Sequence, residues 1–96
     1  MLLKAGVDIS RLKREARRSL PIVAAVFAAF DEELVITSTY EGNHGEGSLH
    51  YSDDAYDVRE PKVSLGIIVV QLKDRLGTAF DVVLEEDHIH IEYDPK

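Results

Sequence analysis

The chain has 96 residues, of which 45% are hydrophobic and 30% are charged, so it is too apolar to be intrinsically disordered. A formal net charge of −7 disfavours binding to nucleic-acid phosphates, which requires clustered lysine and arginine. The absence of cysteine excludes disulfides and thiolate metal sites, so any metal must be held by histidine and carboxylate. At this length we expect residues 1–96 to form a single domain.

The first third of the chain predicts two helices, over residues 9–18 and 20–31. Pro21 cannot donate a main-chain hydrogen bond, so it favours the first turn of a second helix over the interior of one long helix. The second helix is apolar nearly all round, which indicates burial against a sheet. Its apolar run is shorter than the roughly 20 residues that a membrane span needs. We therefore expect no membrane partner and no export signal of the chain's own.

The rest of the chain predicts an α+β domain. A glycine-rich loop over residues 40–47 separates two β-branched, apolar segments. Near the C-terminus, two strands with a short acidic connection predict an antiparallel hairpin. Helices that come first in the chain, followed by strands joined in hairpins, favour a small antiparallel sheet with helices packed on one face. The expected strands are 34–39, 55–59, 80–85 and 88–93, with a helix over 63–76 that Gly77 ends.

The four histidines of the chain, His44, His50, His88 and His90, all lie in or beside two segments, 48–57 and 87–90. Side chains two apart in a strand point to the same side, so His88 and His90 face one way. Two histidines and a carboxylate from distant points of a chain are typical of a catalytic Zn²⁺ site. We therefore expect Zn²⁺ as the cofactor.

These residues carry a family resemblance. Ser48-x-His50, six residues and Asp57, with Ala55 two before the aspartate, resembles the Ser-x-His-x-x-Gly-x-Ala-x-Asp motif of a group of zinc metallopeptidases. That group, the LAS metallopeptidases, includes D-alanyl-D-alanine carboxypeptidases, phage endolysins and hedgehog-like proteins. The pair His88-x-His90 resembles its second motif, and Asp87-x-x-His90 matches the Asp/Glu-x-x-His form of its peptidases. The resemblance covers roughly residues 34–93 and implies a fold like that of hedgehog and the D,D-peptidases.

One position departs from the motif, because Asp53 stands where the family has glycine. An L-residue favours a loop that avoids positive φ at this point, although aspartate tolerates positive φ better than most residues.

The resemblance implies that His50, Asp57 and His90 are the zinc ligands. Asp87 would be the general base that takes a proton from the zinc-bound water. Strict alternation along the last strand would place Asp87 opposite the histidines and Glu86 beside them. Asp87 can therefore serve only if the chain turns there, and Glu86 and Glu85 remain alternatives for the base.

Four further residues receive roles from the resemblance. His88 would stabilise the transition state or orient the base, and His44 would polarise the substrate carbonyl or bind substrate. A plain loop residue is an equally good interpretation of His44. Ser48 and Arg59 are the candidates for substrate binding, with Arg59 on a peptide carboxylate.

The function implied is hydrolysis of the stem peptide of bacterial peptidoglycan. Both a D,D-carboxypeptidase and an L-alanyl-D-glutamate endopeptidase fit. Without an export signal, the chain is similar to a compact phage or prophage lysis enzyme, made in the cytoplasm and acting on the cell wall. Two other interpretations remain open: a zinc-binding recognition module without hydrolytic activity, and a structural domain without metal.

Overall fold

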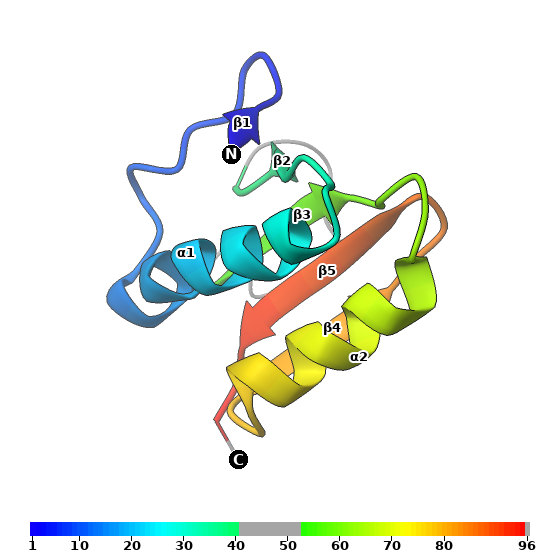
Figure 1. Ribbon diagram of the computed structural model, residues 1–96. Coiled ribbons are helices and arrows are strands. Elements are labelled where there is room, and N and C mark those ends of the chain that lie inside the picture. The colour runs from blue at the N-terminus through cyan, green and yellow to red at the C-terminus, as the bar shows by residue number, and fades with distance from the viewer. Residues whose placement is uncertain (41–52, 96) are drawn as a thin grey trace.

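The computed structural model describes residues 1–40 and 53–95, which form an α+β domain with two helices and a five-stranded sheet (Figure 1). His44, Ser48 and His50 lie outside the described residues. The elements in chain order are β1 (Leu2–Leu3), α1 (Arg14–Ala29), β2 (Val35–Ser38), β3 (Ala55–Arg59), α2 (Leu65–Leu76), β4 (Phe80–Leu84) and β5 (His88–Tyr93).

The strand order in the sheet is β1-β2-β3-β5-β4, so β5 lies between β3 and β4. Strands β2 to β5 pair in antiparallel fashion, and the predicted hairpin of β4 and β5 is confirmed. The sheet is nevertheless mixed and not wholly antiparallel as predicted, because β1 pairs with β2 in parallel. Two residues are too few to show a strand pattern in the sequence. The strand forms because β2 supplies main-chain partners, including the carbonyl of Ile36 for the Lys4 N–H at 2.9 Å.

Both helices cover the same face of the sheet, as predicted (Figure 1). Alternation along β5 turns Ile89 and Ile91 into the core, where both are fully buried with side chains from both helices. Tyr56 and Val58 of β3 join the same core. The remaining residues of β3 and β5 therefore face the side of the sheet that the helices leave uncovered.

Helix α1 corrects the prediction of two helices, because Pro21 lies inside it. The exposed proline removes only one main-chain donor, while Leu20 and Val23 beside it are buried, so packing maintains one continuous helix. The helix also begins later than predicted. Before it, the Arg17 guanidinium donates to the carbonyls of Ile9, Ser10 and Leu12 at 3.2, 2.8 and 3.3 Å, which holds that segment in a non-helical path.

Helix α2 begins at Leu65, two residues after the predicted start, because Ser64 has a left-handed backbone with φ of 61°. It ends as predicted at Gly77, whose φ of 80° is easy only for glycine. In the described part of the chain, neither helix combines the length and the apolar character that a membrane span requires.

Candidate metal centre

The centre lies on the face of the sheet opposite to the two helices, where β3 and β5 run side by side. Asp57 is the direct partner of His90 in this pairing, and Arg59 is the partner of His88. Because residues two apart in a strand share a face, these four side chains all lie on the same side. The sheet register thus brings together Asp57 and His90, which are 33 residues apart in the chain.

Asp57 is central to the group, and it is only 8% exposed. Its Oδ1 lies 3.0 Å from His90 Nδ1, and its Oδ2 lies 3.7 Å from His88 Nε2. The two oxygens of one carboxylate therefore face two different imidazoles.

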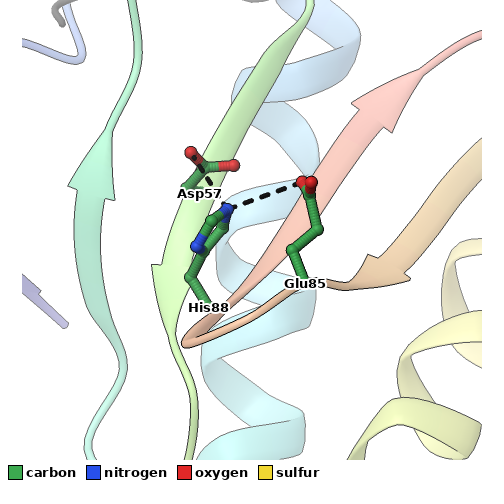
Figure 2. A group of neighbouring side chains, drawn as sticks. All are labelled: Asp57, Glu85 and His88. Carbon is green, nitrogen blue, oxygen red and sulfur yellow. Dashed lines mark ion pairs between the residues drawn. The ribbon is translucent and has the colours of Figure 1, made fainter. Parts of the chain in front are cut away.

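Glu85 reaches the same place from the turn between β4 and β5. Its Oε1 lies 3.5 Å from His88 Nε2 and 3.9 Å from His90 Nδ1. Figure 2 shows the side chains of Asp57, Glu85 and His88 converging from three segments of the chain. Each offers one ligand atom, and these atoms lie within 4.8 Å of one another, so the group could hold a metal ion. Tetrahedral ligands at ~2.0–2.2 Å from Zn²⁺ are about 3.3–3.6 Å apart, close to the two separations at His88 Nε2.

His90 has a carboxylate on each ring nitrogen. Besides the contact of Nδ1 with Asp57, its Nε2 lies 2.6 Å from Glu92 Oε1. Burial alone would lower the pKa of His90, but the hydrogen bonds to Asp57 and Glu92 outweigh it and raise the pKa to about 9. The ring therefore carries both protons at neutral pH when no metal is bound. A metal on Nδ1 would displace one proton and leave the other on Nε2, donated to Glu92.

The His88 ring also contacts a carboxylate of the turn. Its Nδ1 lies 2.8 Å from Asp87 Oδ1. Burial opposes a charge on the ring, but the hydrogen bond to Asp87 and the charges of Asp57 and Glu85 raise the pKa of His88 above its usual value. Asp87 lies in the turn, outside β5, and its side chain is 86% exposed. The chain therefore turns at Asp87, which is the condition for Asp87 to act as the general base.

Of the residues singled out from the sequence, the structure brings together Asp57, His88, His90 and Asp87. Arg59 lines a pocket beside them. The alternation that would put Glu86 beside the histidines does not continue past the turn. Glu85, and not Glu86, lies beside His88 and His90, where it is a potential metal ligand.

The sequence analysis did not predict Glu85 as a potential metal ligand or Glu92 as the hydrogen-bond partner of His90. Glu92 shares the β5 face of His88 and His90, so the alternation of 88–93 was a sufficient signal for it. The placement of Glu85 depends on the hairpin turn, where the Glu85 N–H donates to the His88 carbonyl at 2.9 Å. No periodic pattern in the sequence specifies that turn.

Asp53 has a positive φ of 65°, so the expectation that the loop avoids positive φ at this position is wrong. Its main-chain carbonyl accepts the Lys13 N–H at 3.0 Å, and its carboxylate lies 3.5 Å from the Arg11 guanidinium. These contacts tie the start of β3 to the segment before α1, while an L-residue holds the left-handed conformation.

No family model and no curated protein matches the chain.

Proposed function

We propose that this chain is a zinc-dependent peptidase in which Asp57, His90 and His50 hold the ion. The observation that carries the proposal is the pairing of Asp57 with His90 across β3 and β5, at 3.0 Å between candidate ligand atoms on the sheet face opposite to the helices. The spacing of the two sequence motifs, like that of LAS peptidases, supplies His50 as the third ligand. Imidazole and carboxylate suit Zn²⁺, and such a site leaves a position for water.

Two ligand sets share Asp57, and the first is favoured. In the second, formed by Asp57, Glu85 and His88, the ion would lie on Nε2 of His88 while Nδ1 keeps its contact with Asp87, but this set lacks the motif spacing that supports His50 and His90. In the first, His90 keeps Glu92 on its second nitrogen, the arrangement common around histidine ligands of zinc. His88 then remains available to position Asp87 through their 2.8 Å contact.

The chemistry follows from these positions. Zn²⁺ held by these residues would acidify a water molecule and polarise the carbonyl of the scissile peptide bond. Asp87 accepts a proton from the attacking water and delivers it to the leaving amine as the C–N bond breaks. Its 86% exposure and its place on the turn leave it accessible to a bound peptide. The imidazolium of His88 stabilises negative charge that develops on the substrate oxygen.

The proposed substrate is the stem peptide of bacterial peptidoglycan, by similarity of the motifs to those of D,D-carboxypeptidases and phage endolysins. An α+β domain with both helices on one face and the candidate centre on the other is compatible with a hedgehog-like or D,D-peptidase-like fold. A phage or prophage lysis enzyme acting on the cell wall is the context we propose.

A second function, recognition through bound zinc without hydrolysis, is favoured by one observation. Glu85 Oε1 lies 3.5 and 3.9 Å from nitrogens of His88 and His90. From there it could take the position that a catalytic zinc leaves for water.

The test combines metal content with product analysis. The purified chain is loaded with Zn²⁺ and dialysed, zinc is quantified by mass spectrometry, and muropeptide products are identified after incubation. We expect one zinc per chain, and cleavage that a chelator stops and added Zn²⁺ restores. Asp87→Asn should abolish turnover but retain zinc, whereas Asp54→Asn, beside Lys13 and away from the centre, should change neither.

Two variants separate the ligand sets. Zinc lost in His90→Gln and retained in His88→Gln supports the set with His50, and the reverse supports the set with Glu85. Zinc without products supports the recognition module. A chain that takes up no zinc would contradict both functions.

A further inference from the structure

A pocket of about 360 Å³ adjoins the candidate metal centre on the face of the sheet opposite to the helices. Asp57, His88 and Asp87 form one part of its lining. The other part consists of Lys4, Thr37 and Arg59. The pocket thus joins the proposed reaction centre to two cationic side chains and a hydroxyl.

Four strands position these groups. Arg59 follows Asp57 by two residues on β3, so both side chains lie on the same face, and Arg59 is the direct partner of His88. Lys4 follows β1, and its N–H bond to the Ile36 carbonyl fixes it beside β2, where Thr37 is the next residue. Lys4 therefore comes from the β1 edge of the sheet and Arg59 from its central strand, β3.

The charges of the pocket favour an anion. Neither Lys4 nor Arg59 forms an ion pair with another residue of the described ranges 1–40 and 53–95. This is unexpected in a chain with 18 acidic residues against 11 basic ones. A divalent ion at Asp57 would offset the negative charge of the opposite wall, and the pocket as a whole would then be positive.

We infer that Lys4 and Arg59 bind a free carboxylate on the residue that follows the scissile bond of the substrate. This inference rests on the proposed function and names its substrate class. A guanidinium matches a carboxylate through two parallel hydrogen bonds, and an ammonium adds a point charge. The volume is near the lower end of the ~300–1,000 Å³ of ligand pockets, which suits a single residue with its carboxylate.

The same carboxylate chemistry has two sources. A C-terminal residue makes the enzyme a carboxypeptidase, and an acidic residue with a free carboxylate makes it an endopeptidase. Three peptides distinguish them: one with a free C-terminus, its C-terminal amide, and an amidated peptide with an acidic residue after the scissile bond. Cleavage of the first alone assigns a carboxypeptidase, and cleavage of the third assigns an endopeptidase. Equal cleavage of all three would overturn the subsite.

Direct binding is measured separately from hydrolysis. N-acetyl-D-alanine and its amide are titrated into the full chain, with and without Zn²⁺, and followed by NMR at the main-chain amides of Lys4, Thr37 and Arg59. We expect the carboxylate to bind at least about tenfold more tightly than the amide, because hydrogen bonds to charged groups are the stronger ones. Selective binding without hydrolysis would support the subsite and count against the proposed peptidase.

Variants assign the effect to the two cations. Arg59→Gln and Lys4→Gln should each weaken carboxylate binding about tenfold and raise KM more than they lower kcat. Both side chains are exposed, so the thermal unfolding midpoint should not change. Lys62→Gln removes an exposed cation that does not line the pocket and is the matched control. The inference is overturned if acid and amide bind equally, or if the pocket variants bind like Lys62→Gln.

Discussion

Asp57 Oδ1 lies 3.0 Å from His90 Nδ1, and the two residues are direct partners on neighbouring strands. Without metal, the pair shares a proton, which His90 donates to Asp57. In the proposed zinc site the same two atoms would be ligands, and the proton would have to leave. Folding, protonation and metal binding would then be coupled at this one pair.

The first prediction concerns the pH dependence of stability without metal. The pKa of His90 is about 9 in the folded chain and about 6.5 unfolded. A raised folded pKa contributes stability that is fully present below pH 6.5 and is lost as pH rises through 9. We expect the free energy of unfolding to fall by on the order of 2–3 kcal/mol between pH 6.5 and 9.5.

This decrease is measured by urea denaturation in EDTA across that range. The raised pKa of His88 acts in the same direction. In His90→Gln most of the slope should disappear, because glutamine does not titrate. A wild-type stability that stays constant or rises with pH would contradict the protonated pair.

The second prediction concerns proton release. Because His90 carries both protons at pH 7, zinc binding should release at least about one proton per ion. Titration calorimetry in two buffers of different ionisation enthalpy measures this number. Repeating the titration at pH 9.5, above the pKa of His90, should give a smaller release. Equal release at both pH values would mean that His90 is not the group displaced.

Parts of the candidate centre were predictable because they depend on regular structure. The alternation of 88–93 was sufficient to place His88 and His90 on one face, and the strand 55–59 carries Asp57. What the sequence could not provide is the register that sets Asp57 opposite His90. Register depends on main-chain pairing over five positions, and no single residue encodes it.

The failures of prediction have a common physical cause, which is that tertiary contacts override local preference. Pro21 signals a break, yet the buried side chains on either side keep α1 continuous. Strand β1 has almost no intrinsic signal and depends on β2 for its pairing. Glu85 enters the centre through a turn, where side-chain direction follows no period.

The third prediction identifies Glu92 as the residue that positions the His90 ring through the 2.6 Å contact with Nε2. Glu92→Leu removes the acceptor and should weaken zinc binding about 10- to 100-fold. Glu92→Gln keeps an acceptor oxygen and should lose less. Competition with a chromophoric chelator measures the affinity, and ¹⁵N NMR shows which ring nitrogen carries the proton in the zinc-bound form.

Asp94→Asn is the matched control, since Asp94 lies just beyond β5, in a group with Glu92 and Asp81, and its loss removes the same charge. If Asp94→Asn weakens zinc binding as much as Glu92→Leu, general loss of negative charge explains both.

The fourth prediction concerns the left-handed backbone of Asp53. Asp53→Gly and Asp53→Ala both remove the ion pair with Arg11, but only glycine adopts positive φ without a steric penalty. We expect the glycine variant to be about 1 kcal/mol more stable than the alanine variant. Thermal unfolding of the two variants side by side measures the difference. Equal stability would mean that the chain relaxes to a negative φ in the alanine variant.

The last prediction concerns the buried contact between α1 and the centre of the core. Ser19 Oγ lies 2.6 Å from Tyr56 OH and also donates to the Ala16 carbonyl at 2.6 Å. Because the serine hydroxyl has one proton, the tyrosine must donate to the serine. Tyr56→Phe therefore removes one hydrogen bond and should cost about 1–2 kcal/mol, and Ser19→Ala, which leaves the buried tyrosine hydroxyl without its acceptor, about 1–3 kcal/mol.

A double-mutant cycle decides whether the two hydroxyls act as a pair. The double variant should cost less than the sum of the single variants by about 1 kcal/mol, because neither buried partner is left unpaired. Burial raises the pKa of Tyr56 despite the hydrogen bond with Ser19, so the tyrosine stays neutral throughout the range of the measurement. Tyr93→Phe, at a half-buried position on β5, is the control. Additive single costs would show that Ser19 and Tyr56 contribute to packing independently.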